Sequence, residues 1–348
     1  MKTQAYAALA ATSALAPYTI ERREPGRRDV LIDIIYCGVC HSDIHQARGE
    51  WPNSIFPMVP GHEIVGRVAG VGTEGKKFRA GDTVGVGCLV DSCGQCEPCK
   101  AGDEQYCERG WSLTYNGYEQ DGKTPTYGGY STRIVVNEDF VVKIPDRMPL
   151  DRAAPLLCAG ITTYSPLRHW KVGAGQEVGI IGLGGLGHMG VKLAKAMGAK
   201  VAVLSHSPGK REDALGLGAD DFIATREAKA FERNARRFHF LLDTVSAAHD
   251  YNAYLNLLRR DATMVLVGLP APSPLDATPL VFERRRIAGS AIGGLRETQE
   301  MLDFCAARGV VADIETIAIQ QINEAYERMI KGDVRYRFVI DNATLAGA

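Results

Sequence analysis

The stretch EVGIIGLGGLG at Glu177–Gly187 decides the fold of the second half of the chain. It predicts an apolar strand over 177–181, and a helical segment follows from about 185 to 197. Glycines between a strand and a helix permit a tight turn and close approach to a pyrophosphate, which the helix N-terminus can bind. The pattern predicts a dinucleotide site, with a ligand-free turn as the alternative. Its residues are Gly182, Leu183, Gly184, Gly185, Leu186 and Gly187.

Strands and helices alternate on the C-terminal side of this stretch. Ser207-Pro208 is typical of a helix start, with an N-cap serine and a proline at the first helical position. Strand, turn and helix in repetition predict a parallel sheet with right-handed crossovers. The predicted strands are 200–204, 222–224, 238–242, 264–267 and 286–291. The tail beyond Gly293 has helical and β-like runs without this rhythm, so it could return to the first domain.

The end of the second strand indicates which cofactor binds. An NAD site carries an acidic residue there for the ribose 2′-hydroxyl. This chain has LSHSPGKR at 204–211 and no acid before Glu212. Hydroxyls followed by two cations suit a 2′-phosphate, so the loop predicts NADP(H), with a solvated loop as the alternative. The predicted contacts are Ser205, His206, Ser207, Lys210 and Arg211.

The first half of the chain has a different texture. Residues 1–146 are rich in Gly, Pro, Val and Ile, with short β-like runs at 30–36, 63–71, 83–86 and 131–136. Such runs predict an irregular, barrel-like β domain. A length of 348 residues predicts two domains. The formal net charge of −1 gives no field that would attract nucleic acid or anionic lipid. No stretch is apolar enough to span a bilayer, and a cytoplasmic N-terminus is favoured over a signal peptide.

Four cysteines are clustered as Cys93-x2-Cys96-x2-Cys99-x7-Cys107. Short loops allow such thiolates to converge on one tetrahedral zinc ion. A four-thiolate site has no open position, so it would stabilise a loop and not bind substrate. The alternative is an iron–sulfur cluster, but the ferredoxin pattern continues with a shorter gap and a proline. Clustered thiols in a large chain also favour metal binding over a disulfide framework.

A third set of candidates is dispersed through the chain. Its segments are CHSDIH at 40–45, GHE at 61–63 and CAG at 158–160. A lone cysteine is usually a small buried hydrophobic residue. A lone histidine is usually a satisfied polar side chain. From spacing alone, each of these segments is ambiguous.

Taken together, these segments resemble the zinc-dependent medium-chain alcohol dehydrogenases. Within that family the chain is most similar to the cinnamyl-alcohol-dehydrogenase-like, NADPH-dependent aldehyde reductases. The resemblance runs nearly end to end. It is carried by YCGVCHSD at 36–43, PGHE at 60–63, the four-cysteine segment, residues 182–187, GG at 293–294, ETQE at 297–300 and YRF at 336–338.

The resemblance implies an α/β plus β fold. A GroES-like β-barrel catalytic domain would comprise 1–155, with 293–348 returning to it. A Rossmann domain, a doubly wound parallel sheet that binds NADP, would be inserted at 156–292. The active site would lie in the cleft between these domains. The resemblance also implies a homodimer with two zinc ions per chain, one catalytic and one structural. Composition and charge, as described above, favour a cytoplasmic protein with no nucleic-acid or membrane partner.

The resemblance further assigns roles to individual residues. Cys40, His62 and Cys158 correspond to the Cys2His ligands of the catalytic zinc, an arrangement known for alcohol dehydrogenase. Glu63 corresponds to an alternative zinc ligand, and Asp43 to the carboxylate that orients the ligand histidine. Ser42 and His45 correspond to a proton relay, and Trp51 and Trp111 to walls of the substrate pocket. The remaining cofactor contacts would be Thr162, Thr244, Gly268, Ser290, Ala291, Ile292 and Arg337.

The chain is thus expected to reduce a broad range of aromatic and aliphatic aldehydes to primary alcohols. The alternatives are a polyol or secondary-alcohol dehydrogenase, a catalytically silent NADPH-binding protein and an iron–sulfur electron carrier. The phosphate loop departs from the family's hydroxyl- and lysine-rich pattern at His206 and Gly209. Cofactor preference therefore follows less firmly from the sequence than metal content does.

Overall fold

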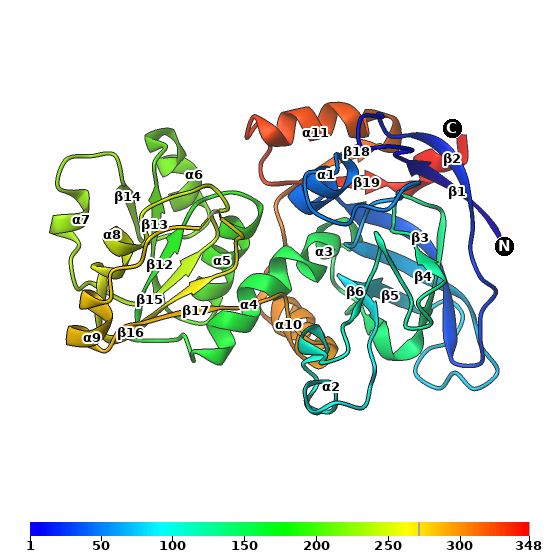
Figure 1. Cartoon of the computed structure of the whole chain (residues 1–348), viewed down its shortest axis with the longest axis horizontal. Coiled ribbons are helices and arrows are strands. Elements are labelled where there is room, and N and C mark those ends of the chain that lie inside the picture. Colours follow the sequence, from blue (N-terminus) through cyan, green and yellow to red (C-terminus); the bar gives the residue numbers. More distant parts are fainter. Residues whose placement is uncertain (271, 348) are drawn as a thin grey trace. The chain divides into compact units, whose positions relative to one another are not determined.

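The computed structural model describes residues 1–270 and 272–347. It divides into two compact units (Figure 1). The first comprises Met1–Cys158 and Gly293–Ala348, and the second comprises Ala159–Ile292. None of the helices in the described part of the chain has the length and apolar character needed to cross a membrane.

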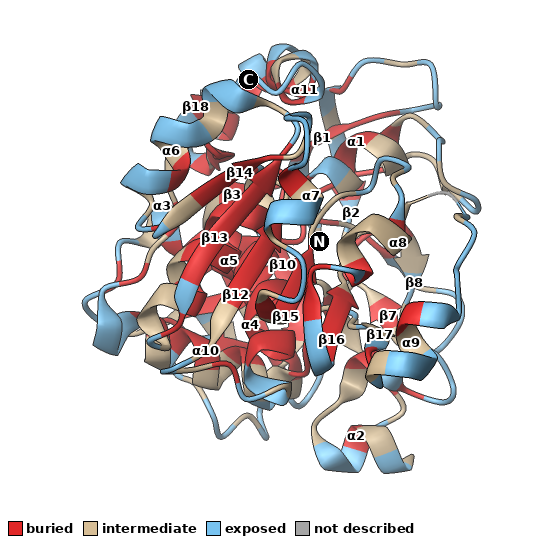
Figure 2. Ribbon diagram, turned by 90° about the vertical axis from the view of Figure 1, so that its left-hand side faces the viewer, coloured by how far each residue is buried: buried red, intermediate tan, exposed pale blue. Residues whose placement is uncertain are grey.

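The second unit contains a six-stranded, all-parallel sheet in the order β14-β13-β12-β15-β16-β17. Ile180 of the central strand pairs with Val203 on one side and Leu242 on the other. Strands covered on both faces need nearly continuous apolar sequence, and β12, β13 and β15 are mostly buried in Figure 2. This strand order is that of a Rossmann sheet, which confirms the predicted fold class.

The strands of this sheet are β12 (Glu177–Ile181), β13 (Lys200–Ser205), β14 (Asp221–Ala224), β15 (Phe238–Asp243), β16 (Leu258–Leu266) and β17 (Arg286–Gly289). The helices of the unit are α4 (Ala159–His169), α5 (Gly185–Ala196), α6 (Arg211–Gly216), α7 (Ala230–Arg233), α8 (Tyr251–Leu255) and α9 (Thr278–Glu283).

The structure differs from the sequence predictions at three elements of this unit. Strand β16 begins at Leu258, before the predicted 264, because exposed charged residues at 259–261 hide its apolar pattern. Ser207 precedes a single 3-10 turn, and helix α6 begins only at Arg211. Helix α4 was not predicted, because it is buried almost all round and contains Pro166, so it lacks an amphipathic pattern.

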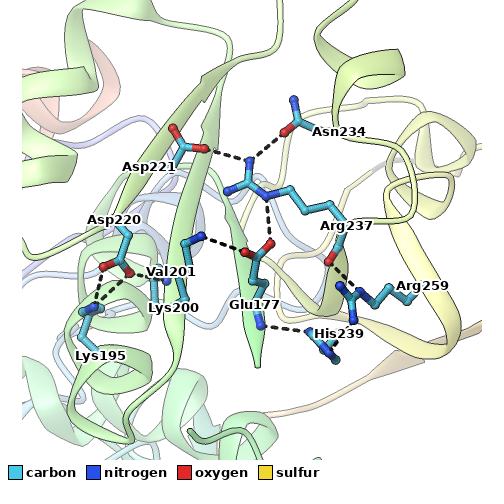
Figure 3. Close-up of polar contacts among 10 residues, drawn as sticks. All are labelled: Glu177, Lys195, Lys200, Val201, Asp220, Asp221, Asn234, Arg237, His239 and Arg259. Atoms are coloured by element: carbon cyan, nitrogen blue, oxygen red, sulfur yellow. Dashed lines mark hydrogen bonds and ion pairs between the residues drawn. The ribbon is translucent and has the colours of Figure 1, made fainter. Parts of the chain in front are cut away.

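Ion pairs join the amino-terminal ends of the strands in this unit (Figure 3). Glu177 begins β12 and pairs with Lys200 of β13 at 2.9 Å and with Arg237 at 3.0 Å. Arg237 also pairs with Asp221 of β14 at 2.8 Å. The hydrogen bond from Lys200 is the main reason why the pKa of Glu177 lies below its usual value. Ion pairs therefore connect the strands at their amino-terminal ends, while the glycine loop lies at the carboxyl-terminal end of β12.

The first unit is built on a seven-stranded, mostly antiparallel sheet with the path β11-β5-β4-β3-β19-β18, and β10 pairs with β3. The late strand β19 pairs with the early strand β3, with Val339 opposite Gly38. The tail after Gly293 therefore belongs to this unit. Its sheet strands are β3 (Asp29–Gly38), β4 (Ile64–Val71), β5 (Thr83–Val86), β10 (Arg133–Asn137), β11 (Val142–Lys143), β18 (Ile314–Ala318) and β19 (Arg337–Asp341).

Short hairpins and helices complete the first unit. The paired strands outside the main sheet are β1 (Lys2–Ala7) with β2 (Ala16–Glu21), β6 (Leu89–Asp91) with β7 (Ser112–Leu113), and β8 (Gly117–Tyr118) with β9 (Pro125–Thr126). The helices are α1 (His41–Ala47), α2 (Glu97–Ala101), α3 (Leu150–Ala153), α10 (Leu295–Arg308) and α11 (Ile322–Ile330).

Candidate active site

Four buried side chains converge within the first unit: Cys40, His62, Glu63 and Cys158. Their ligand atoms all lie within 4.8 Å of one another. Cys40 immediately precedes α1, while His62 and Glu63 immediately precede β4. Cys158 follows the 3-10 turn η3 (Ala154–Leu157). Strand pairing between β3 and β4 thus brings together residues that are far apart in sequence.

The chemistry of this donor set fits a zinc ion. The Sγ atoms of Cys40 and Cys158 are 3.9 Å apart. The hydrogen bond with Cys158 is the main factor that holds the pKa of Cys40 well below its usual range, and Arg337 contributes to this shift. Nε2 of His62 is buried and has no hydrogen-bond partner among the described residues. A thiolate and an imidazole nitrogen are ligands that zinc prefers.

Arg337 lies beside this cluster and is itself buried. Its Nη1 atom is 3.2 Å from Oε1 of Glu63 and donates a hydrogen bond to the Val39 carbonyl at 3.1 Å. Burial raises the pKa of Glu63 to about 7, against the opposing effect of the Arg337 charge. Sequence reasoning placed Arg337 only among the cofactor contacts. Its pairing with Glu63 was missed, because nothing in the sequence links a C-terminal strand to residue 63.

Asp43 lies behind His62 and is completely buried. Its Oδ1 atom is 3.6 Å from Nδ1 of His62 and accepts the Gly61 N–H at 3.2 Å. Its Oδ2 atom accepts the Cys40 N–H at 2.8 Å. One carboxylate therefore contacts two of the three segments that supply metal-ligand candidates.

The two predicted relay residues lie on helix α1. Ser42 is next to the cluster, with Oγ 3.3 Å from Sγ of Cys40. His45 is farther out and partly exposed, and its Nδ1 atom is 2.5 Å from Oε2 of Glu50. The His45 ring stacks on Trp51 at 5.2 Å between centroids. Glu50 was not predicted, although its position five residues beyond His45 is visible in the sequence. Trp111 is partly exposed and directly precedes β7.

The four clustered cysteines also converge in the first unit, and their ligand atoms lie within 4.8 Å of one another. Sγ of Cys96 is 3.3 Å from that of Cys99 and 3.9 Å from that of Cys107. The N–H groups of Gln95 and Cys96 donate to Sγ of Cys93, and these two bonds are the main reason why its pKa falls to about 6. The backbone thus stabilises a thiolate, which is the metal-binding form.

In the second unit, the glycine loop lies between β12 and α5, as the sequence predicted. Gly182 has φ of 88°, a conformation that residues with a Cβ rarely adopt. A Cβ on Gly187 would collide with the Gly182 carbonyl, so glycine is required for the helix to approach this turn. Thr244, at the end of β15, donates a hydrogen bond to the Ile181 carbonyl at 2.7 Å. The loop therefore has the close backbone approach that a pyrophosphate site needs.

The predicted phosphate-binding loop follows β13, the strand next to β12. Ser205 is buried, and its Oγ accepts the Ser207 N–H at 3.2 Å. Nζ of Lys210 donates to the Leu183 carbonyl at 2.7 Å, which brings a positive charge to the glycine loop. The guanidinium of Arg211 lies over the Phe222 ring at 5.1 Å. His206 is exposed.

Comparisons with known proteins agree with this geometry. The family model "Alcohol dehydrogenase GroES-like domain" matches residues 26–146, and "Zinc-binding dehydrogenase" matches residues 185–307. The chain is 56% identical over 351 residues to aldehyde reductase YahK of Escherichia coli, covering 99% of each protein. It is 57% identical to NADP-dependent alcohol dehydrogenase C 1 of Mycolicibacterium smegmatis, covering 98% of each.

The chain belongs to the zinc-dependent medium-chain alcohol dehydrogenases. A cinnamyl alcohol dehydrogenase from Sorghum bicolor has the same fold, with a TM-score of 0.96 and 47% identity over 99% of this chain and 98% of that one. The chain is an oxidoreductase that transfers hydride between NADP(H) and an alcohol or aldehyde, and it uses zinc.

In this alcohol dehydrogenase, the remaining predicted cofactor residues occur in two settings. Thr244, Gly268 and Ser290–Ile292 all follow the carboxyl ends of strands β15, β16 and β17. Ser290 donates its N–H to Leu266 at 3.1 Å, and Gly268 lies against the Val245 carbonyl, where a Cβ would be 2.7 Å away. Thr162 is buried in α4. Carboxyl strand ends are where ligands bind in such sheets, so these positions suit cofactor contacts.

Proposed function

We propose that this alcohol dehydrogenase reduces a broad range of aromatic and aliphatic aldehydes to primary alcohols with NADPH. The observation that carries the proposal is the buried cluster of Cys40, His62 and Cys158, with the Ser42 hydroxyl beside it. Two thiolates and one imidazole are the three protein ligands of a catalytic zinc that keeps a fourth position open. Bound zinc supplies Lewis-acid polarisation of a carbonyl oxygen, and NADPH supplies hydride.

The protein's own residues bind the substrate oxygen, orient the ligand histidine and transfer the proton. Ser42, 3.3 Å from a zinc-ligand candidate, can donate a hydrogen bond to the substrate oxygen. His45 then passes the proton to or from solvent, and its contact with Glu50 sets the orientation of the ring. Asp43 orients His62 from behind. Glu63 is an alternative ligand whose charge Arg337 balances. Trp51, stacked on His45, is one wall of the substrate pocket, and Trp111 is another.

The four-cysteine site is assigned to a second, structural zinc, which makes two ions per chain. Its four thiols form a closed set and share no residue with the buried cluster. The iron–sulfur alternative predicts strong visible absorption, which a spectrum of the purified protein tests.

Selection of NADP(H) is assigned to the loop after β13, supported by the cations at Lys210 and Arg211 and by the absence of an acid before Glu212. A charge-assisted bond contributes about 1.5–3 kcal/mol, so Lys210→Ala and Arg211→Ala should each lower kcat/KM for NADPH roughly 10- to 150-fold. Activity with NADH should hardly change. Ser205→Asp should repel the phosphate and shift preference toward NADH. Equal losses with both cofactors would refute this assignment.

The enzyme is proposed to be a cytoplasmic homodimer with the domains 1–155 plus 293–348 and 156–292. The division of the structure after Cys158 supports these domains. Strand β17 is at one edge of its sheet, and the same unit exposes the apolar side chains of Leu269, Val281 and Phe282 at 78%, 69% and 80%. An unpaired edge strand with nearby apolar surface favours pairing with a second copy. Sedimentation equilibrium tests the dimer.

The proposed substrate class is tested by initial rates over a panel of aromatic aldehydes, aliphatic aldehydes, ketones and polyols, each with NADPH and NADH. We expect kcat/KM to be highest for aldehydes with NADPH, and both aldehyde classes to be turned over. Higher values for ketones or polyols would contradict the proposal and indicate a secondary-alcohol or polyol dehydrogenase.

A further inference from the structure

Two buried tyrosines contact the carboxylate of Asp43, which lies behind the zinc-ligand candidate His62. The Tyr130 hydroxyl donates a hydrogen bond to Oδ2 at 3.1 Å. The Tyr115 side chain lies close to the same carboxylate. Tyr130 is 0% exposed and Tyr115 is 4% exposed, so water does not compete for the bond from Tyr130. Neither tyrosine belongs to the motifs that identify the zinc ligands.

Tyr115 also covers one face of the His62 ring. The ring centroids are 5.7 Å apart, and the two planes are parallel to within 1°. The carboxylate of Asp43 meets the edge of the imidazole at Nδ1. Tyr115 therefore restricts rotation of the His62 ring directly, through stacking.

Backbone hydrogen bonds join the segment of Tyr130 to the loop that bears His62. Its N–H donates to the Pro60 carbonyl at 3.0 Å, and the preceding Gly129 donates to the Gly61 carbonyl at 2.8 Å. Gly61 has φ of 104°, and a Cβ at this position would lie 2.7 Å from Cδ1 of Tyr130. The ring of Tyr130 thus occupies space that only a glycine at position 61 leaves open.

We propose that Tyr130 and Tyr115 are positioning residues that fix the His62 imidazole for zinc binding, Tyr130 by holding Asp43 and Tyr115 by stacking on the ring. This inference rests on the proposed zinc site of Cys40, His62 and Cys158. A carboxylate has about four lone-pair positions. Two backbone N–H groups and the Tyr130 hydroxyl bond its oxygens, so that Oδ1 remains directed at Nδ1 of His62. Removing a hydroxyl leaves a buried acceptor unsatisfied and frees the carboxylate to turn.

The test measures zinc release to a chromogenic chelator from the holoenzymes of Tyr130→Phe, which lacks the hydroxyl that bonds Asp43, and Tyr115→Leu, which lacks the ring that stacks on His62. Cys158→Ser identifies the phase that comes from the buried cluster, because it should lack that phase. Outer partners of metal ligands change affinity by 10- to 100-fold, so we expect each variant to release this zinc about tenfold faster. The phase from the four-cysteine site should not change. Tyr6→Phe is the matched control, because Tyr6 is a buried tyrosine of the same unit.

A second measurement separates positioning from general destabilisation. After cobalt substitution, the visible absorption bands report the geometry of the buried site, and they should shift in both variants but not in Tyr6→Phe. Unchanged zinc release and an unchanged spectrum in folded variants would overturn the proposal, and so would equal acceleration of both release phases. If Tyr130→Phe does not fold, Tyr115→Leu decides the question. If the wild type has no release phase that Cys158→Ser removes, the proposed zinc site itself is wrong.

Discussion

The two cysteine-containing clusters differ in how the chain assembles them. The four-cysteine site is local: its ligands come from residues 93–107, and backbone N–H groups of the same loop donate to Sγ of Cys93. The buried cluster is assembled from three distant segments, and its polar partners include Asp43, Arg337 and two tyrosines. One site has four similar thiols that form a closed set. The other combines thiols with an imidazole and a carboxylate, and a hydroxyl lies beside it.

This difference assigns stability to the four-cysteine site and chemistry to the buried cluster. A closed thiolate set contributes binding energy to folding and offers no position for substrate. The buried cluster depends on the packed core, so the fold must already exist before its ligands meet. We therefore expect substitutions in the first site to reduce stability and substitutions in the second to reduce turnover.

The largest effect is expected for Cys158→Ser. Loss of one thiolate should remove zinc from the buried cluster and lower kcat by at least about 10³-fold, since Lewis-acid stabilisation is worth several kcal/mol. Metal analysis should find one zinc fewer per chain. Cys305→Ser is the control, because Cys305 is a buried thiol on α10 outside both clusters. Full activity in Cys158→Ser would contradict the assignment of catalysis to the buried cluster.

Cys99→Ser should have the opposite profile. Opening the closed site should lower Tm by about 10 °C, which corresponds to roughly 3 to 5 kcal/mol at about 2–4 °C per kcal/mol. The kcat of the fraction that remains folded should change little. Calorimetry and active-site titration measure the two quantities. A variant that keeps its Tm but loses turnover would show that the roles of the two sites have been exchanged.

Substitutions in the proposed proton relay of Ser42 and His45 test whether chemistry takes place at the buried cluster. His45→Gln should slow alcohol oxidation roughly 10- to 100-fold at low pH, where proton release limits the rate, because solvent replaces a relay only in part. Ser42→Ala should cost more, because Ser42 is next to the cluster while His45 lies farther out. The measurement is the pH dependence of kcat in the oxidation direction. An unchanged profile in His45→Gln would remove this residue from the mechanism.

The smallest effect is expected for Ser92→Ala at the edge of the four-cysteine site. Ser92 is buried, and its Oγ is 3.3 Å from Sγ of Cys99. Loss of this bond should lower the free energy of unfolding by about 1 kcal/mol and Tm by about 2–4 °C. Zinc content and kcat should remain those of the wild type. Loss of turnover without loss of stability would contradict the structural role of this site.

The sequence by itself determined the elements whose signals are local. The glycine pattern at 182–187 and the alternation of strands and helices predicted the Rossmann sheet, and the four cysteines at 93–107 predicted a metal site, because neighbouring residues supply the whole signal. The same holds for the cations after β13. Helix α4 escaped this reasoning, because a helix buried on all sides has no amphipathic period.

Only the tertiary structure decided which distant residues meet. Cys40, His62 and Cys158 were ambiguous one by one and were identified only through a family resemblance. Pairing of β3 with β4 and of β3 with β19 then brings Cys40, His62 and Arg337 together. Tyr115, Tyr130 and Glu50 have no motif, so their contacts became visible only in the fold. The physical reason is that register between distant strands depends on packing of the whole core, and no local spacing records it.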